Sequence, residues 1–489
     1  MRALRRATPA PFGAFDGEPR ERFGGHQVTL DSKFLERLSG TCAIIDIAPE
    51  SLTEAGRDWW PISLRWALSG AVTARPGVVA RPASTAEVAA VLRCCNDAGV
   101  PVTAAGGRSG VCGGAVPVFG GVSLDCCGLQ GVLEVHNPTS LVDVKAGTFG
   151  DDLEKELRSA HGITIGHWPQ SVALATIGGS IACRGAGQYS TRYGKIEDMV
   201  AGLEVVLADG TVVRTGQLAA FGAGPRSAMG PDLTSMFVGS EGTLGVITSA
   251  RLRGHPVAPE ERRAAWAFPS FADGLEALRR TLQRGATPAV VRLYDATESK
   301  RSFDGLDTNL LIALDEGDGF IVEAAMAVLS EECATAEPLD VSLVEHWFNH
   351  RNDMSALELV IRAGIVVARS RSQQPGMSSR PSTRARWRPW RRRPGSSRPR
   401  PTSRTRTSRA PACTSPLLVK VPTHLTTPGR RTSTGALGRP YSAPLRSKVD
   451  LSATTMESAS SEVSTCQTPL ARASKCCRNS RTRSIRGAS

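Results

Sequence analysis

Short apolar runs separated by glycine turns fill the chain from about residue 71 onward. Gly77–Ala80, Val100–Ala104 and Leu203–Leu207 have the length and composition of buried strands, whereas Val88–Asn96, which follows the cap residue Ser84, has helical spacing. The other elements expected in this part are strands at 121–125, 141–146, 211–215 and 245–252 and a helix at 151–161. Mixed strands and helices with many glycine turns favour an α+β domain over a regular doubly wound sheet.

A second pattern of strands and helices begins at residue 262. Strands are expected at Ala264–Phe268 and Ala289–Leu293, and helices at Phe271–Arg284 and Phe320–Cys333. Helical signals before residue 66 indicate a lead-in that packs on the main domain. The expected organisation is a partly helical lead-in at 1–66, a main domain at 67–255, a second α+β domain at 256–367 and a tail at 368–489.

The excess positive charge lies entirely in the tail. A formal net charge of +13 would by itself suggest a protein that binds nucleic acid or anionic membranes. Residues 368–489, however, hold 26 Lys and Arg against 3 Asp and Glu, a balance of +23, while residues 1–367 hold 33 against 43, a balance of −10. Because Arg369–Arg409 has almost no apolar residues, the tail cannot bury enough surface to offset its ordering entropy, and we expect it to be disordered.

Metal, export and membrane signals are missing from the pattern. The 12 cysteines include three adjacent pairs but never the two-residue spacing of a zinc knuckle, so we expect reduced thiols and no metal site. The N-terminal arginines have no apolar segment behind them, and no apolar run reaches the ~18 residues of a membrane span. A cytoplasmic protein without a transmembrane segment is therefore expected.

The first segment with chemical potential is the glycine-rich run Ala104–Val111, directly after apolar Val100–Val102. Its glycines allow backbone N–H groups to approach a diphosphate, because no Cβ blocks the anion. The run is neither a P-loop, since Gly-Lys-Ser/Thr is missing, nor a Rossmann fingerprint, since the spacing and the following helix are missing. An ordinary glycine-rich turn is the alternative interpretation.

Two further blocks follow in order. The second comprises Gly166–Ser171, Thr176–Gly179, Arg184–Gly187 and Tyr193–Asp198, and the third is the glycine turn and strand Val238–Thr248. Each piece alone is typical of a loop, and a single histidine such as His167 is more often structural than catalytic. The order of the three blocks is the informative feature.

Taken in this order, the blocks resemble the PCMH-type FAD-binding domain shared by the vanillyl-alcohol-oxidase, D-lactate dehydrogenase and alkylglycerone-phosphate synthase families. The resemblance implies an α+β fold with a two-subdomain FAD-binding domain, followed here by a truncated α+β substrate (cap) domain. In these families the glycine loop holds the pyrophosphate, the second block lies along the ribityl chain and isoalloxazine, and the third closes on the cofactor.

Carried over by position, the resemblance implies a set of cofactor-binding residues. They are Thr103, Ala104, Ala105, Gly106, Gly107, Arg108, Ser109, Pro169, Gln170, Ser171, Ala175, Thr176, Gly178, Gly179, Ala182, Cys183, Arg184, Gly185, Glu241, Gly242, Thr243, Leu244, Gly245, Val246 and Ile247. Arg108 stands where covalently flavinylated relatives have the linking histidine. The resemblance therefore implies non-covalent FAD.

Three features resemble the alkylglycerone-phosphate (alkyl-dihydroxyacetonephosphate) synthase branch: Gly166–His167 before Pro169–Ser171, the Tyr193–Asp198 block, and Gly230–Leu233 ahead of Glu241. By resemblance, His167 and Arg292 are catalytic, and Arg351 contacts the substrate phosphate. Such synthases attach N5 of FAD to C1 of acyl-dihydroxyacetone phosphate, release a fatty acid and form an ether with a fatty alcohol, without net redox change. A homodimer and a peripheral membrane contact stay open.

The resemblance stops at about Val367. The branch continues with a tyrosine-bearing strand, three histidines before Gly-Val-Gly, and a final Asp-Pro-x-Gly-Ile, none of which is in this sequence. With synonymous codons shifted by one position, residues 411–420, 451–462 and 473–489 become compatible with these landmarks. We therefore expect residues 368–489 to be out of frame and turnover to be impaired.

Two other functions remain as hypotheses. One is an FAD-linked 2-hydroxy-acid or alcohol dehydrogenase or oxidase of the same superfamily. The other, of a different class, is a non-catalytic basic nucleic-acid-binding protein that depends on the tail, although no specific nucleic acid is expected.

Overall fold

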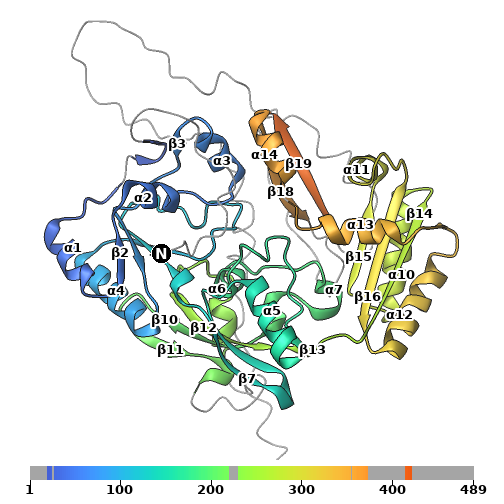
Figure 1. The fold of residues 1–489 in the computed structure, drawn as a ribbon, viewed down its shortest axis with the longest axis horizontal. Coiled ribbons are helices and arrows are strands. Elements are labelled where there is room, and N and C mark those ends of the chain that lie inside the picture. The colour runs from blue at the N-terminus through green and yellow to red at the C-terminus, as the bar shows by residue number, and fades with distance from the viewer. Residues whose placement is uncertain (1–18, 25–26, 220–229, 354, 373–412, 421–489) are drawn as a thin grey trace, which may run out of the picture. The chain divides into compact units, whose positions relative to one another are not determined.

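The computed structural model describes residues 19–24, 27–219, 230–353, 355–372 and 413–420 (Figure 1). Its strands form three larger sheets, and the strands of the first two lie between residues 44 and 253. None of the helices in these ranges is both long enough and apolar enough to span a membrane.

The first sheet has four strands in the order β2 (Ile44–Asp46), β4 (Val78–Arg81), β6 (Val122–Asp125) and β5 (Val102–Ala105). β6 pairs in parallel with β4 and β5, while β2 pairs antiparallel with β4. Helix α4 (Thr85–Ala98) begins at Ser84, whose side chain accepts from the N–H of Glu87, and ends at Gly99 with φ +64°. Its buried side chains join the core of this sheet together with Phe34 and Leu38 of α1 (Ser32–Ser39). The segment before residue 66 thus contributes a strand and a core helix, beyond the packing role expected of it.

The second sheet is antiparallel, in the order β11 (Val212–Arg214), β10 (Val200–Val206), β12 (Val246–Arg253), β8 (Leu141–Lys145) and β7 (Val132–His136). Its core includes Leu153 and Leu157 from α5 (Gly150–His161) and Ile177 and Ile181 from α6 (Ile177–Ala182). Every residue of β10 is buried, including Glu204, which interrupts the apolar run in the sequence.

The third sheet lies in the second part of the chain, in the order β15 (Val290–Tyr294), β16 (Asn309–Gly317), β14 (Glu260–Phe268) and β17 (Glu337–Leu339), all antiparallel. Side chains alternate between its two faces, as the strand period requires. Leu311 and Ala313 pack with α10 (Phe271–Gln283) and α12 (Gly319–Glu332), whereas Leu310 and Ile312 face a second cluster that contains Trp347 of α13 (Ser342–His350).

Shorter elements complete the described chain. They are strands β1 (Arg20–Glu21), β3 (Ala71–Val72), β9 (Ile163–Thr164) and β13 (His255–Pro256); helices α2 (Pro49–Ala55), α3 (Pro61–Ala67), α7 (Ser190–Tyr193), α8 (Ile196–Met199), α9 (Leu233–Phe237), α11 (Ala296–Ser302) and α14 (Ser355–Arg362); and 3-10 turns at Cys126–Gly128, Asn137–Thr139 and Gly216–Leu218.

Part of the tail differs from the expectation of disorder. Residues 368–372 complete β18 (Ile365–Ser372), which pairs antiparallel with β19 (Cys413–Lys420). The backbone of these residues therefore has a strand partner, which composition alone did not indicate. The rest of the expected disordered tail, including most of Arg369–Arg409, lies outside the described residues.

Candidate cofactor site

The glycine loop follows β5 and packs directly against the second block. A Cβ added to Gly106 would lie 2.3 Å from Oγ1 of Thr176, and one added to Gly107 would lie 1.7 Å from the carbonyl oxygen of Leu174. Neither position has room for a side chain, so the two glycines are required by the approach of these segments. Two blocks more than 60 residues apart in the sequence are thus in contact.

The second block is anchored to the second sheet through α6. The side chain of Thr176 accepts from the N–H of Gly179 (3.2 Å), while the N–H of Gly178 donates to the carbonyl of Ala146 (2.7 Å) just beyond β8. A Cβ on Gly178 would lie 2.7 Å from that of Ala146. Gly178 therefore permits close packing of α6 on the sheet. Ala175 is buried beside it.

The third block rests on the end of α6 and on the end of β5. The N–H of Glu241 donates to the carbonyl of Ala182 (3.1 Å), and Nε of Arg184 donates to the carbonyl of Val238 (3.1 Å). A Cβ on Gly242 would lie 3.5 Å from that of Ala104, the residue before Ala105 and the glycine loop. The structure therefore brings the three blocks together where the first and second sheets meet.

Backbone strain marks all three blocks. Five non-glycine residues of the described chain have positive φ, and three of them are Arg108 (+55°), Arg184 (+49°) and Glu241 (+50°), one in each block. Such conformations cost free energy, persist where surrounding contacts fix them, and concentrate at ligand sites. The strain indicates that the backbone course of the three loops is tightly specified.

His167 is buried without a hydrogen-bond partner. Its side chain is 5% exposed, and neither ring nitrogen has a partner among the described residues. Burial lowers its pKa to about 4, so the imidazole is neutral at pH 7, with one nitrogen able to donate and the other able to accept. A buried polar group without a partner requires an explanation, and a bound molecule would provide one.

The backbone before His167 is fixed by Glu154 of α5. The N–H groups of Ile165 and Gly166 donate to its Oε1 (2.9 and 3.2 Å), while the Thr164 hydroxyl and Nε of Arg158 donate to its Oε2 (2.7 and 3.2 Å). These four bonds satisfy a buried carboxylate. Glu154 has no motif signal in the sequence.

Asp58 is a second residue that the sequence pattern did not reveal. Its carboxyl group is 2% exposed, and Oδ1 accepts from the N–H of Trp60 (3.0 Å). Oδ2 has no partner among the described residues and would lie 3.8 Å from a Cβ on Gly110 of the glycine loop. Burial raises its pKa to about 6. Asp58 is recognised as part of this site only in the folded structure, where residues 55–60 approach the glycine loop.

The remaining predicted cofactor residues occupy the same three segments. In the first block, Thr103, Ala104 and Ala105 end β5. In the second, the carbonyls of Pro169 and Ser171 accept from turn N–H groups, Cys183 ends α6, and the N–H of Gly185 donates to the carbonyl of Ser180. In the third, the Thr243 hydroxyl donates to the carbonyl of Ser240, and Leu244 and Gly245 lead into Val246 and Ile247 of β12. Ser109 lies in the glycine loop and Gln170 in the Pro169–Ser171 turn. The guanidinium group of Arg108 donates to the carbonyls of Ala55 and Ala115 and to the hydroxyl of Ser123.

Arg292 and Arg351 lie beside the same tryptophan. The guanidinium carbon of Arg292, on β15, is 5.4 Å from the Trp347 ring centroid, and that of Arg351, at the end of α13, is 6.0 Å from it. Arg351 also stacks 3.7 Å over Phe348, and desolvation lowers its pKa. Neither guanidinium has a carboxylate within ion-pair distance among the described residues, and Nε of Arg351 is buried without a partner there. Two guanidinium groups beside one ring, neither with an ion-pair partner among the described residues, are candidates to hold an anion.

Gln188 connects this cationic pair to His167. Its N–H donates to the carbonyl of Trp168 (2.7 Å), and its side-chain amide donates to the carbonyl of Arg351 (3.3 Å). His167 and Arg351 are therefore joined through two residues, Trp168 and Gln188. The sequence-predicted catalytic and substrate residues lie in one continuous region.

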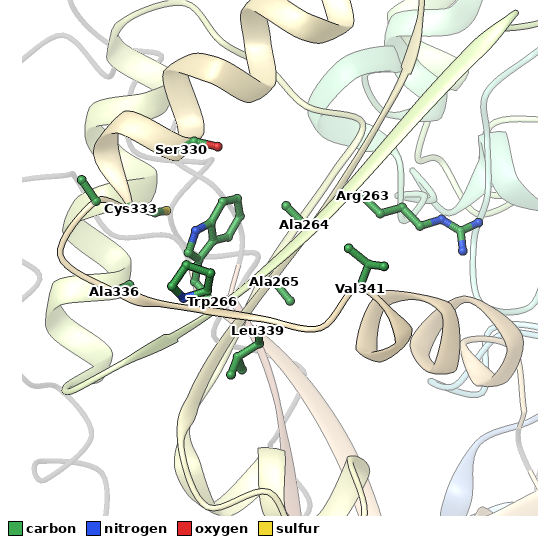
Figure 2. A pocket seen from close by; sticks show the side chains of 11 residues that line it. Arg263, Ala264, Ala265, Trp266, Ser330, Cys333, Ala336, Leu339 and Val341 are labelled. Atoms are coloured by element: carbon green, nitrogen blue, oxygen red, sulfur yellow. The ribbon is translucent and has the colours of Figure 1, made fainter.

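A separate hollow lies on the third sheet (Figure 2). Its volume is about 430 Å³, and its lining includes Trp266 of β14, Cys333 at the end of α12, and Leu339 of β17. Arg263 lies at one end, and its guanidinium carbon is also 5.1 Å from the Phe348 ring centroid. No residue predicted for cofactor or substrate binding lines this hollow.

Comparison with known proteins agrees with the geometry of the first two sheets. Residues 76–216 match the family model described as FAD binding domain. The chain is 35% identical over 286 residues to the uncharacterized FAD-linked oxidoreductase YgcU of Escherichia coli O157:H7, covering 57% of each protein. It is 32% identical over 237 residues to an alkyldihydroxyacetonephosphate synthase of Dictyostelium discoideum, covering 48% of this chain and 38% of the synthase. The aligned parts thus span only about half, or less, of these relatives.

The fold agrees with a solved structure. An alkyldihydroxyacetonephosphate synthase structure superposes with a TM-score of 0.63 over 74% of this chain and 71% of the synthase, at 23% identity. This likeness confirms the mixed α+β fold expected from the sequence.

Proposed function

We propose that this chain, which carries a PCMH-type FAD-binding domain and is related to FAD-linked oxidoreductases and alkyldihydroxyacetonephosphate synthases, acts on a phosphorylated lipid substrate in the manner of the synthases. The substrates would be acyl-dihydroxyacetone phosphate and a fatty alcohol. The cationic pair Arg292 and Arg351, held without a described carboxylate partner next to the His167 segment, is the observation that carries this proposal.

FAD fits the residues that would hold it. Because Gly106 and Gly107 carry no side chain, the glycine loop packs closely against Thr176 and Leu174. The backbone N–H groups of the loop would hold the diphosphate, and the second and third blocks would lie along the flavin. When bound, FAD would supply the N5 centre at which the exchange of acyl for alkyl takes place. FAD would be bound non-covalently, because Arg108 stands at the position of the linking histidine.

The residues of the chain would bind, orient and move a proton. Arg292 and Arg351 would hold the substrate phosphate by charge-assisted hydrogen bonds, with Trp347 and Phe348 limiting the directions of the guanidinium groups. Neutral His167 could accept the proton of the incoming alcohol at one ring nitrogen while the other keeps its N–H.

A second candidate is an FAD-linked dehydrogenase or oxidase of a 2-hydroxy acid or alcohol. The relation to YgcU supports it, and the same arginine pair could bind a carboxylate instead of a phosphate. The nucleic-acid-binding alternative depends on residues 368–489, nearly all of which lie outside the described residues.

One experiment separates the two enzymatic candidates. The FAD-loaded chain, as given and with residues 368–489 returned to the reading frame inferred above, is mixed without oxygen with D-lactate or D-2-hydroxyglutarate while the flavin absorbance is followed. Both forms are mixed separately with acyl-dihydroxyacetone phosphate and labelled fatty alcohol. Labelled ether without bleaching supports the synthase. Bleaching without ether supports the dehydrogenase and contradicts our first proposal.

We also propose that the tail is out of frame and impairs turnover. Sequencing the nucleotides around codons 362–370 tests this directly, because a single inserted or deleted base should be present. Restoring the frame should then raise ether formation. Equal rates for the given and the frame-restored chains would refute the impairment.

A further inference from the structure

We propose that Arg108 is a positioning residue that holds the glycine loop in shape for the FAD diphosphate and does not itself contact the flavin. The proposal rests on FAD as the cofactor and is independent of which reaction the protein catalyses. It changes the role implied by resemblance, in which position 108 belongs to the cofactor contacts.

The guanidinium of Arg108 joins three separate segments. Nη1 donates to the carbonyls of Ala55 (2.9 Å) and Ala115 (3.1 Å), and Nη2 donates to the hydroxyl of Ser123 (2.8 Å). Ala55 ends α2, Ala115 lies beyond the glycine loop, and Ser123 is a fully buried residue of β6. The side chain therefore connects the lead-in, its own loop and the first sheet.

The backbone of Arg108 is held as firmly as its side chain. Its φ of +55° is unfavourable for a residue with a Cβ, and its carbonyl accepts from the N–H of Trp59 (3.2 Å). The residue thus keeps a strained conformation because contacts on both sides of the backbone fix it.

The glycine loop must be held in place because it packs against the second block without free space. Gly106 and Gly107 already press against Thr176 and Leu174, so a small shift of the loop would produce a clash or open a gap. A diphosphate held by backbone N–H groups requires those groups at fixed positions. Residues 55–60 also pack close by, since a Cβ on Gly113, two residues beyond the loop, would lie 3.1 Å from the Trp60 ring.

An arginine suits this role better than any other side chain. Its planar fork reaches acceptors in different directions at the same time, whereas the ammonium group of lysine is a single point. Methionine fills a similar volume but would leave the carbonyls of Ala55 and Ala115 without this donor.

The test compares FAD with riboflavin, which lacks the diphosphate. Full-length Arg108→Met, Arg108→Lys and the control Arg251→Met are stripped of flavin and titrated with each ligand by fluorescence. Arg251 is a matched control, because its guanidinium also bonds three acceptors, two oxygens of Asp143 and the carbonyl of Gln217, on the second sheet. Arg108→Met should weaken FAD binding by about tenfold or more and leave riboflavin binding unchanged. Arg108→Lys should lie between, and Arg251→Met should match the unaltered chain.

Three results would overturn the proposal: FAD affinity unchanged in Arg108→Met, equal loss of FAD and riboflavin affinity in that variant, or the same FAD loss in Arg251→Met. If Arg108→Met does not fold, Ser123→Ala removes one acceptor and should still lower FAD affinity selectively; no loss would refute the role. Ether or dehydrogenase activity does not enter this test, so a failure of the proposed reaction remains distinguishable.

Discussion

His167 and Asp58 are two buried titratable groups whose pKa values move in opposite senses. Burial disfavours the charged form of each, which lowers the pKa of the imidazole to about 4 and raises that of the carboxyl group to about 6. Between pH 6.5 and 4 the folded chain thus resists a proton at His167 and retains one at Asp58. Their effects on stability oppose each other in this window.

Separating these two groups is the first prediction. In the unaltered chain, acidification from pH 6.5 to 4 lowers the stability through His167, because the unfolded state binds the proton first, and raises it through Asp58, because the folded state binds it first. His167→Gln lacks this His167-dependent loss. Its free energy of unfolding, measured relative to that of the unaltered chain, should therefore rise by about 3 kcal/mol when the pH is lowered from about 6.5 to about 4.

The measurement is urea unfolding at several pH values. Asp58→Asn should show the opposite trend and lose about 3 kcal/mol relative to the unaltered chain on acidification. Parallel curves for the three proteins would show that neither group is buried as described.

Gly107 is a position in the candidate site that has no room for a side chain. A Cβ there would lie 1.7 Å from the carbonyl oxygen of Leu174, and backbone cannot move aside as a flexible side chain can. Gly107→Ala should cost about 1–3 kcal/mol in free energy of unfolding and reduce FAD retention. Gly40→Ala is the control, because its nearest contact would be 3.7 Å away. Flavin content and thermal melting measure both variants, and equal behaviour of the two would contradict the loop packing.

At the scale of elements, periodicity located most strands of the three larger sheets and the four longest described helices, α4, α5, α10 and α12, within a few residues. It missed β2, β7, β16 and β17, of which β16 lies between β15 and β14 in the third sheet. β16 ends in Asp315 and Glu316, which are typical of a surface turn, yet both are buried because Arg192 and Tyr193 of α7 bond them. α6 was also missed, since Gly178–Gly179 argues against a helix until Ala146 is seen to require glycine there.

The three glycine-containing blocks could be recognised in the sequence because glycine spacing is local. The roles of Glu154, Asp58 and Arg108 could not, because each depends on partners from distant segments. Long-range hydrogen bonds leave no periodic signal in a single sequence.

Helix α5 should lose its hold on the His167 segment when Glu154 is neutralised. A glutamine offers one acceptor oxygen, whereas Glu154 uses both oxygens for four donors. Glu154→Gln should lower the free energy of unfolding by about 1–3 kcal/mol. Glu156→Gln, exposed on the same helix, should change it by less than ~0.5 kcal/mol. Chemical denaturation of both variants tests this, and equal effects would refute the role of Glu154.

At the scale of the whole described chain, α7 connects the second block to the third sheet. Arg192 bonds Asp315, which is 0% exposed, and the Tyr193 hydroxyl donates to Glu316 (2.6 Å). Under the proposed function, this connection keeps the His167 segment next to the sheet that carries Arg292.

Breaking this connection should be costly. Arg192→Met leaves the buried carboxylate of Asp315 without its cation, and we expect a loss of about 3–5 kcal/mol in stability. Lys300→Met, which breaks the exposed pair with Asp307, should cost about 1 kcal/mol or less. Urea unfolding followed by tryptophan fluorescence measures both variants. A loss near 1 kcal/mol for Arg192→Met would mean that the pair of Arg192 and Asp315 does not hold α7 to the third sheet.

The central proposal for this protein is a non-covalent FAD site formed by the three loops. It is measured by the flavin content of the purified, FAD-reconstituted full chain, before and after acid precipitation. We expect a flavin absorbance spectrum with about one FAD per chain and complete release of FAD into the acid supernatant, because Arg108 cannot form the histidyl link. A chain that takes up no FAD, or a denatured pellet that stays yellow, would contradict it.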